Sequence, residues 1–304
     1  MDKLKIVDKD NSILFSRGLV ASNLTKIGIS FLEAHKIAEE IKNTLLSNNV
    51  FEIEKKEMDN YIYQFLIDVK NINYAENFVL FNKIIELEEP IIILIAGTTG
   101  IGKSTIALSL AHRLNFRSLI GTDSIRELMR KVLSSELIPE LHKSSYEAGI
   151  HSKHYLSPKF NPIISGYSEQ SKIVIVGVEA LIKRAIYEGQ NLIIEGVHLS
   201  PEFISEEILN HPNVIVIMLN LEDEKKHRNR IRIRAQHISM RRPAEKYLSN
   251  FENIRLIQKY LKEQARITGI KTIENIDREE TIKKLTEIVI KCIKKIIEKK
   301  TKIN

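Results

Sequence analysis

Residues 91–105 constrain the fold of this chain more than any other segment does. An unbroken apolar run, Ile91–Ala96, leads directly into Gly97-Thr98-Thr99-Gly100-Ile101-Gly102-Lys103-Ser104. After this segment, apolar residues recur at helical spacing, at Ile106, Leu110 and Leu114. The glycine segment fits the pattern G-x-x-x-x-G-K-[ST], in which glycines let several backbone N–H groups point at one phosphate. The sequence therefore predicts a buried strand, a phosphate-binding loop and a helix, in that order.

The polar residues of this loop have expected partners on a nucleoside triphosphate. In loops of this type the lysine, here Lys103, reaches the β- and γ-phosphates, and the hydroxyl of Ser104 binds Mg²⁺. The positive end of the following helix adds to the attraction for phosphate. The residues that we predict to bind the nucleotide are Gly97, Thr98, Thr99, Gly100, Gly102, Lys103, Ser104 and Thr105. ATP and Mg²⁺ are therefore the expected cofactors.

The carboxyl-terminal part of the chain has the pattern of a parallel α/β fold. Further apolar runs, separated by helical segments, occur at Leu119–Ile120, Leu192–Ile194 and Val214–Leu219, and Ile273–Ile276 is the candidate for a last strand. Unbroken apolar strands between helices are typical of parallel sheets that are covered on both faces. We expect a P-loop core, with a parallel sheet flanked by helices, at residues 89–304.

Residues 1–88 have a different pattern and are predicted to form a small, mainly helical domain. Leu4–Val7 and Ile13–Phe15 have the character of short strands around a polar turn. Ser30 and Glu33 have the spacing of a capping box, and apolar residues follow them at helical spacing. The chain is therefore expected to contain two domains.

Two acidic residues are expected near the phosphate loop, because each lies at the end of a predicted strand. Asp123 follows the Leu119–Ile120 run, and Glu195 ends the Leu192–Ile194 run. Ligands of open α/β sheets bind at the carboxyl ends of the strands. We predict that Asp123 orients an acceptor hydroxyl or a Mg²⁺-bound water, and that Glu195 binds Mg²⁺ through water. The alternative role of Asp123 is to cap a helix at Ser124–Leu133.

The basic residues are concentrated in one segment. The net charge is +7, and residues 225–242 alone hold eight Lys or Arg and no acid, so the rest of the chain is near neutral. A nucleic-acid-binding protein spreads basic residues over a surface, whereas a local cluster suits a small polyanion. We interpret the segment as a lid whose arginines neutralise transferring phosphates. If it is helical, only one pair can face the site, Arg228 with Arg232 or Arg230 with Arg234. The spacing does not decide between the pairs, and we assign catalysis to Arg228 and Arg232.

Other classes of P-loop protein fit the sequence less well. A GTPase would carry Asn-Lys-x-Asp downstream of the loop, and a motor ATPase usually has a strand ending in an acidic pair, but neither is present. Arg126 and Arg130 lie one helical turn apart, and they are either substrate anchors or exposed helix residues. Ser144 and Glu147 have capping-box spacing. The pattern favours a kinase that acts on a small molecule.

Three segments together resemble the 2-phosphoglycerate kinase family. They read I-P-E-L-H-K-S-S-Y-E-A (138–148), G-Q-N-L-I-I-E-G-V-H-L-S-P (189–201), and H-R-N-R-I-R-I-R-A with R-R-P-A-E-K-Y-L (227–235, 241–248). The resemblance covers roughly residues 90–304. It implies transfer of the ATP γ-phosphate to the 3-hydroxyl of 2-phosphoglycerate, which gives 2,3-bisphosphoglycerate, a precursor of the cyclic form.

The resemblance also adds substrate-binding candidates. His142, Ser144, Ser145, Tyr146 and His198 fall within motifs typical of the family. Together with the anchors named above, Arg126 and Arg130, they form the predicted acceptor site. The metal ligands predicted from the loop and the strand are Ser104 and Glu195.

Residues 1–70 resemble an ATP-cone, a small nucleotide-sensing module. The short hairpin, the A-H-K-I-A-E-E-I helix (34–41) and the Y-I-Y-Q-F-L helix (61–66) match its layout. The turn that reads Lys-Arg-Asp-Gly in such modules is Asp8-Lys9-Asp10-Asn11 here, so one basic residue and the glycine are absent. Nucleotide binding by this domain and a purely structural role both remain open.

Several alternatives and absences complete the expectations. A related kinase for a nucleoside monophosphate or another small hydroxy acid is the alternative enzyme, and an ATP-sensing regulator is the non-enzyme alternative. The chain contains no apolar run of membrane-spanning length and no apolar leader, and its one cysteine, Cys292, has no partner for a disulfide. We expect a cytoplasmic protein with a small-molecule substrate, without nucleic acid or membrane partners, and compatible with a homo-oligomer.

Overall fold

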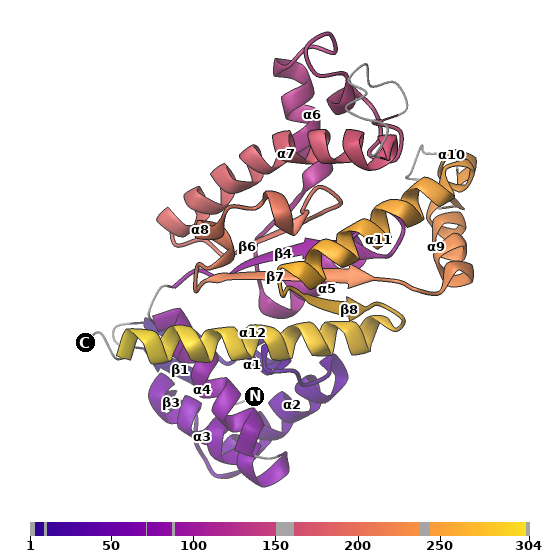
Figure 1. Cartoon of the computed structure of the whole chain (residues 1–304). Coiled ribbons are helices and arrows are strands. Elements are labelled where there is room, and N and C mark those ends of the chain that lie inside the picture. The colour runs from indigo at the N-terminus through magenta and orange to yellow at the C-terminus, as the bar shows by residue number, and fades with distance from the viewer. Residues whose placement is uncertain are drawn as a thin grey trace. The chain divides into compact units, whose positions relative to one another are not determined.

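The computed structural model describes residues 4–8, 11–70, 72–86, 89–149, 161–236 and 244–301 (Figure 1). The chain divides into two compact units. The first unit comprises Met1–Glu89, His112–Asn115 and Lys283–Asn304, and the second comprises Pro90–Ala111 and Phe116–Ile282. These units differ from the predicted domains, 1–88 and 89–304, mainly at the carboxyl terminus, where most of the last helix belongs to the first unit.

The first unit combines a small sheet with helices. Strand β1 (Lys5–Asp8) pairs antiparallel with β2 (Asn11–Leu14) and parallel with β3 (Glu52–Glu54). The helices are α1 (Arg17–Lys26), α2 (Phe31–Ser47), α3 (Lys55–Val69) and α4 (Ile72–Glu86). The predicted cap on α2 is confirmed, because the Glu33 amide donates to Ser30 Oγ at 3.4 Å. The predicted turn at residues 8–11 includes Lys9 and Asp10, which lie outside the described residues.

The second unit is built on a five-stranded sheet, ordered β5-β6-β4-β7-β8. All neighbouring strands in it run parallel. The strands are β4 (Ile92–Ala96), β5 (Ser118–Gly121), β6 (Leu192–Gly196), β7 (Val214–Asn220) and β8 (Lys271–Glu274). The predicted parallel P-loop core is therefore confirmed, although the last strand, Lys271–Glu274, lies two residues earlier in the chain than the predicted Ile273–Ile276.

Helices cover both faces of this sheet. The helical elements of the second unit are α5 (Lys103–Leu114), α6 (Thr122–Val132), η1 (Pro139–His142), α7 (Pro162–Tyr187), η2 (Pro201–Phe203), α8 (Glu206–Leu209), α9 (Glu224–Gln236), α10 (Ala244–Ser249) and α11 (Phe251–Ile267). The last helix, α12 (Arg278–Thr301), belongs mostly to the first unit. Figure 1 shows α7 and α11 on one face of the sheet and α5 on the other. Alternate residues of β4, Ile92, Leu94 and Ala96, pack into one core with α7 and α11. The intervening Ile93 and Ile95 are also fully buried, so the strand is apolar throughout because both its faces are covered.

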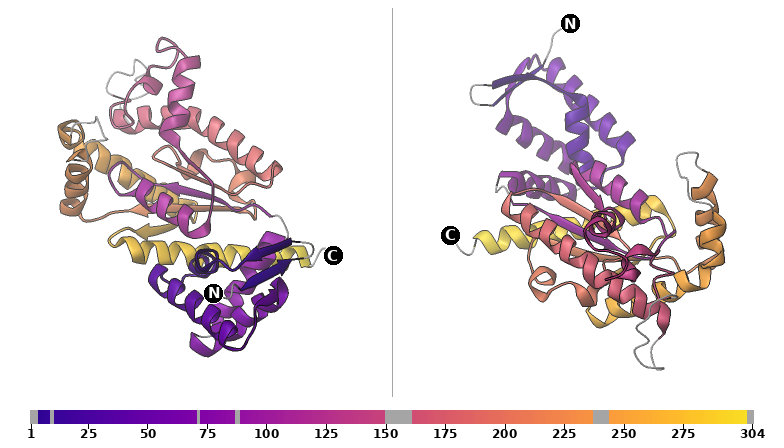
Figure 2. Two further views of the ribbon diagram at one scale, coloured as in Figure 1. Left: turned by 180° about the vertical axis from the view of Figure 1, so that it is seen from behind. Right: turned by 90° about the horizontal axis from the view of Figure 1, so that it is seen from above.

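The order of the strands brings the predicted site residues to one edge of the sheet. The phosphate loop follows β4, and Ile95 of β4 lies beside Glu195 of β6. On the other side of β6, Glu195 lies beside Gly121, the last residue of β5. Figure 2 shows α9 and α10, which follow β7, side by side beyond the sheet. Among the described helices, none has the length and apolar character needed to cross a membrane.

Candidate active site

The phosphate loop has a backbone that requires glycine at its ends. Gly97 has a φ of 146° and Gly102 a φ of 93°, in the region that side chains disfavour. A Cβ on Gly97 would also lie 2.7 Å from the Leu219 carbonyl oxygen. The loop therefore depends on glycine both for its curl and for its close approach to β7.

The Lys103 side chain is poised inside the loop. It is only 8% exposed, and its Nζ donates to the Thr98 carbonyl oxygen at 2.8 Å. Burial lowers its pKa, and the negative charges of Glu195 and Asp123 partly offset that effect. A buried cation with one weak neutral partner gains strongly from a phosphate, which supplies the opposite charge.

Ser104 and Glu195, the two predicted metal ligands, lie in contact. Ser104 Oγ donates to Glu195 Oε1 at 2.7 Å, across the gap between α5 and β6. Both are oxygen donors, which is what Mg²⁺ prefers, and Mg²⁺ usually keeps several waters and phosphate oxygens. In the described part of the chain, no group of three or more His, Cys, Asp or Glu could hold a metal. The pair therefore fits a Mg²⁺ ion that arrives with the nucleotide.

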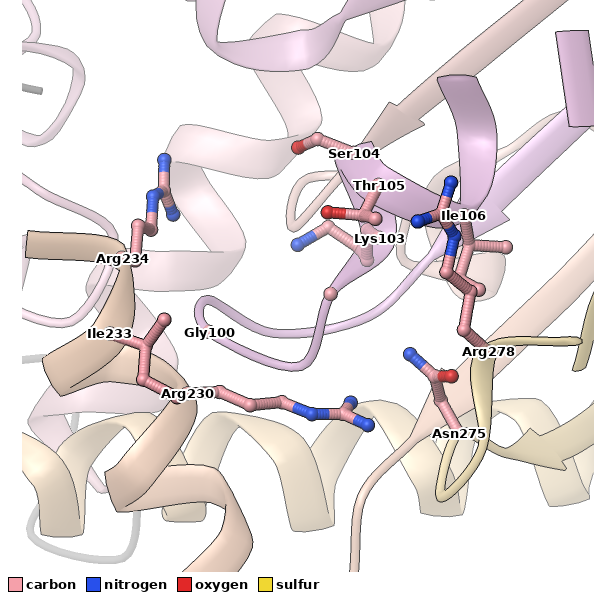
Figure 3. A pocket seen from close by; sticks show the side chains of 11 residues that line it. Gly100, Lys103, Ser104, Thr105, Ile106, Arg230, Ile233, Arg234, Asn275 and Arg278 are labelled. Carbon is pink, nitrogen blue, oxygen red and sulfur yellow. The ribbon is translucent and has the colours of Figure 1, made fainter. Parts of the chain in front are cut away.

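A pocket of about 440 Å³ adjoins the loop, and a pair of arginines from α9 is among the residues that line it. The pair is Arg230 and Arg234, not the predicted Arg228 and Arg232. In Figure 3 the Arg230 side chain runs toward Asn275, whereas Arg234 stands opposite Lys103. The remaining lining residues are Gly100, Gly102, Lys103, Ser104, Thr105, Ile106, Ile233, Asn275 and Arg278.

The structure places the predicted pair of lid arginines, Arg228 and Arg232, outside the pocket because of how α9 packs. The guanidinium of Arg228 lies 3.7 Å above the Phe251 ring and donates to Glu252 at 3.0 Å. Arg232 is exposed and is not among the residues that line the pocket. On the other side of α9, His227 and Arg230 both contact carbonyl oxygens of the phosphate loop, and these contacts bring that side to the pocket. The other arginines of the segment, Arg241 and Arg242, lie outside the described residues.

This arrangement predicts a contrast between two arginines of one helix. Arg234→Ala is expected to lower kcat by about 10²-fold, because a cation aimed at the transferring phosphate is lost. Arg232→Ala is the matched control and is expected to leave kcat unchanged. Steady-state assays of both variants check the prediction. Equal losses in the two variants would contradict the assignment of the pocket arginines.

Asp123 and Arg126 lie together on the first turns of α6. The N-cap of this helix is Gly121 and it has no side-chain cap bond, so the alternative interpretation of Asp123 as the cap is wrong. Asp123 is 53% exposed and lies 3.7 Å from Arg126 Nη2. Arg126 is nearly buried, and its Nε and that of Arg130 have no hydrogen-bond partner among the described residues. Two buried donors without acceptors are suited to an anion.

The 138–149 segment uses most of its polar side chains internally. His142 Nε2 lies 2.8 Å from the Leu133 carbonyl oxygen at the end of α6. Buried Tyr146 packs against Tyr247, with ring centroids 5.7 Å apart and the rings tilted by 59°. Ser144 is half-buried, and a turn follows it instead of a helix, so the predicted capping box is wrong. Ser145 is buried and bonds to Gln170 at 2.6 Å.

His198 is fully buried behind the strand ends. Its Nδ1 lies 2.8 Å from Thr122 Oγ1 and its Nε2 lies 2.9 Å from Gln170 Oε1. Burial lowers the pKa of His198 to about 3, so the ring is neutral at physiological pH. A neutral ring inside the protein holds its neighbours in place and does not carry charge to a ligand.

Comparison with known proteins agrees with this geometry. The AAA domain family matches residues 93–252. The 2-phosphoglycerate kinase of Methanopyrus kandleri is 40% identical over 94% of this chain and 87% of that protein. Those of Methanocaldococcus jannaschii and Methanothermobacter thermautotrophicus are 39% and 38% identical, over 95% and 94% of this chain and 92% and 94% of their own lengths. The chain belongs to the 2-phosphoglycerate kinase family.

Solved structures are much less similar to this chain than these relatives are. Shikimate kinase from Acinetobacter baumannii in complex with shikimate has a TM-score of 0.40 and 15% identity, over 68% of this chain and 96% of that one. A similarity at this level carries no conclusion about substrate. The near full-length matches to 2-phosphoglycerate kinases are what define the family.

Two residues of this 2-phosphoglycerate kinase family member that contact the phosphate loop, His227 and Arg230, lie in the 227–235 motif, whereas Asn275 lies outside every motif. His227 Nε2 lies 2.8 Å from the Thr99 carbonyl oxygen. Arg230 Nη1 and Asn275 Nδ2 both donate to the Ile101 carbonyl oxygen at 2.7 Å. With these carbonyls held outward, the N–H groups of the loop are free to face a phosphate. Asn275 is the residue that the sequence analysis missed, and its one signal is its place directly after the end of β8.

The two buried histidines predict acid-sensitive folding. Burial lowers the pKa of His198 to about 3 and that of His227 to about 4, from 6.5. Below about pH 6.5 the unfolded chain binds protons that the folded chain does not, so stability falls with acid by about 1.4 kcal/mol per pH unit for each histidine. Urea unfolding at about pH 7.5 and about pH 5 measures this slope. His227→Gln is expected to reduce the slope, whereas His112→Gln, at an exposed position, is not.

Proposed function

We propose that this chain transfers the γ-phosphoryl group of Mg-ATP to the 3-hydroxyl of 2-phosphoglycerate, giving 2,3-bisphosphoglycerate and ADP. The proposal is carried by one observation. In a chain of the 2-phosphoglycerate kinase family, groups suited to Mg-ATP and groups suited to an anionic alcohol lie at the same edge of the sheet. Lys103 and the Ser104–Glu195 pair suit the nucleotide and its metal, and Asp123 with Arg126 suits an anionic alcohol.

The nucleotide half of the proposed mechanism belongs to the loop and α9. The N–H groups of the loop and Lys103 hold the β- and γ-phosphates, and Arg230 and Arg234 approach them from the pocket wall. Ser104 and Glu195 would hold Mg²⁺, directly or through water, and the bound ion would supply neutralisation of phosphate charge. Together these groups stabilise the negative charge that moves toward the leaving ADP.

The acceptor half belongs to α6. The acceptor oxygen attacks the γ-phosphorus, the bond to the β-phosphate oxygen breaks, and the hydroxyl proton passes to Asp123. We propose that the phosphate of 2-phosphoglycerate binds Arg126 and Arg130, whose buried Nε groups have no partner among the described residues. We further propose that Ser145, Tyr146, His142 and His198 shape this subsite through their internal contacts, and that Ser144 remains the candidate for direct contact.

An acceptor panel with γ-labelled ATP tests the proposal. We expect label transfer to 2-phosphoglycerate, and none to a nucleoside monophosphate or to shikimate. 3-Phosphoglycerate, whose free hydroxyl is on C2, serves as the positional control and should be a poor acceptor. Transfer to a nucleotide but not to 2-phosphoglycerate would replace this function with the alternative kinase. ATP binding without transfer to any acceptor would favour a regulator.

Some expectations from the sequence stay predictions. These are the cytoplasmic location, the absence of nucleic-acid and membrane partners, a homo-oligomeric state, the supply of product for cyclic 2,3-bisphosphoglycerate, and nucleotide binding by residues 1–88. Gel filtration addresses the oligomeric state. ATP titration of the Lys103→Ala protein addresses a second nucleotide site, because that variant weakens the first.

A further inference from the structure

A buried polar network links the two sides of the proposed acceptor site. His198 and Gln170 are fully buried, and Thr122 and Ser145 are nearly so. Thr122 Oγ1 lies 2.8 Å from His198 Nδ1, and His198 Nε2 lies 2.9 Å from Gln170 Oε1. Ser145 Oγ donates to the same Gln170 oxygen at 2.6 Å. The network therefore spans β5–α6, the loop after β6, the 138–149 segment and α7.

The contacts of Gln170 fix the direction of every hydrogen bond in the network. Its Nε2 lies 2.6 Å from the Glu140 carbonyl oxygen and 2.9 Å from the Lys143 carbonyl oxygen. Two carbonyl oxygens accept hydrogen bonds only, so the amide nitrogen must face them and Oε1 must face His198. His198 then carries its proton on Nε2, and its bare Nδ1 accepts from the Thr122 hydroxyl. With this assignment, each of these hydrogen bonds has one donor and one acceptor.

Both ends of the network reach residues of the proposed acceptor site. Thr122 directly precedes Asp123. The Lys143 carbonyl oxygen, which accepts from Gln170, also accepts from Arg126 Nη1 at 3.1 Å. The buried network therefore includes the residue next to the proposed base, and it shares a carbonyl oxygen with the proposed phosphate anchor.

The close approach of Thr122 to the strand end is specified by a glycine. A Cβ on Gly196 would lie 1.7 Å from Thr122 Oγ1. Only glycine at this position lets the Thr122 hydroxyl pass the end of β6 and reach His198. The backbone of β6 therefore accommodates this hydrogen bond.

We propose that His198 and Gln170 are positioning residues, which set the placement of Asp123 relative to Arg126 and thereby hold the acceptor hydroxyl in line with the γ-phosphate. This inference rests on the proposed function. Apolar residues of similar shape would fill the same space without the desolvation of buried polar groups. Directional bonds in turn fix a geometry that apolar packing does not. The Nδ1 of His198 receives its hydrogen bond from the residue next to the base, which is where small displacements affect transfer most.

Thr122→Val tests the role, because valine keeps the shape of threonine and removes the hydroxyl that His198 Nδ1 accepts from. We expect kcat/KM for 2-phosphoglycerate to fall by about 10²-fold, since a misplacement of about 1 Å has an effect of that size. The KM for ATP is expected to stay near the wild-type value. Thr122→Ser keeps the hydroxyl and should restore most of the activity. Thr286→Val, at an equally buried threonine of α12, should leave both parameters unchanged.

The outcomes separate this inference from the proposed function. If wild-type protein transfers nothing to 2-phosphoglycerate, both fall. If the wild type is active and Thr122→Val matches it, only the positioning role falls. The positioning role would also be overturned if the KM for ATP changed as much as kcat/KM for 2-phosphoglycerate and both changes followed the loss of Tm, since that is the pattern of a purely structural bond. Should Thr122→Val fail to fold, Ser145→Ala, which removes one bond to Gln170, must selectively lower kcat/KM for 2-phosphoglycerate.

Discussion

Lys103→Ala is expected to lower kcat for phosphoryl transfer by about 10³-fold while the protein remains folded. A loss of this size is at the upper end of what removal of one preorganised donor causes. The lysine is buried, and its Nζ has the Thr98 carbonyl oxygen as hydrogen-bond partner at 2.8 Å. Burial lowers its pKa, so the charged form is disfavoured until a phosphate arrives. Lys103 therefore gains its interaction energy from the phosphates of the nucleotide, whose charge moves during transfer.

The same change should not destabilise the protein. Removing a buried cation relieves a desolvation cost, so Tm is expected to equal or exceed that of the wild type. Lys26→Ala is the matched control, because Lys26 is equally buried but lies in the first unit. Label transfer and thermal unfolding of both variants measure the effect. Normal turnover by Lys103→Ala would remove the loop from the mechanism.

Asp123→Asn is expected to lower kcat by about 10²- to 10⁴-fold, the usual contribution of a general base. Asparagine has the size of aspartate and leaves the N-terminal end of α6 unchanged, but its side chain cannot take the acceptor proton. Since Asp123 is about half exposed and its helix has no side-chain cap, the variant should fold normally. The KM for ATP is expected to change little, because the nucleotide contacts lie on α5 and α9.

A neighbouring carboxylate provides the control for this prediction. Glu127 also lies 3.7 Å from Arg126 Nη2, one turn further along α6. Glu127→Gln removes the same charge near the same arginine but leaves Asp123 in place. Single-turnover rates of both variants distinguish proton acceptance from general electrostatics. Similar losses in the two would show that Asp123 acts on Arg126 instead of on the acceptor.

The strands and the phosphate loop of this chain could be predicted because their signals are local. The β4 run is apolar at every position, which only a strand covered on both faces requires, and the glycines of the loop follow it directly. Asp123 and Glu195 were identifiable for the same reason, since parallel strands end at one edge of the sheet. The contact between Ser104 and Glu195 follows from this topology.

The arginines of α9 could not be assigned in the same way. Ile231 and Ile233 are both apolar, and each would turn a different side of the helix inward. The structure buries Ile231 and places Ile233 in the pocket wall, and the contacts of His227 and Arg230 with loop carbonyl oxygens bring Arg230 and Arg234 to the pocket. The phase of a short amphipathic helix depends on what packs against it, here the phosphate loop and Phe251.

The motif residues of the 138–149 segment show a second limit. Their polar side chains suggested substrate contacts, but most of their donors and acceptors bond to other parts of the chain, such as Leu133 and Gln170. Sequence pattern gives the residue type and not the partner. Gln170 lies within α7, where no motif marks it, and yet it determines which nitrogen of His198 carries the proton.

By itself, then, the sequence determined the phosphate loop, the parallel sheet, the family resemblance and the two acids at the strand ends, because each depends on residues that are adjacent or periodic in the chain. Only the tertiary structure decided which arginines line the pocket, which polar residues bond to one another, and how Asp123 and Arg126 are tied to a common network. Those features depend on contacts between segments such as Thr122, Gln170 and His198, which are distant in sequence and meet only when the helices pack on the sheet.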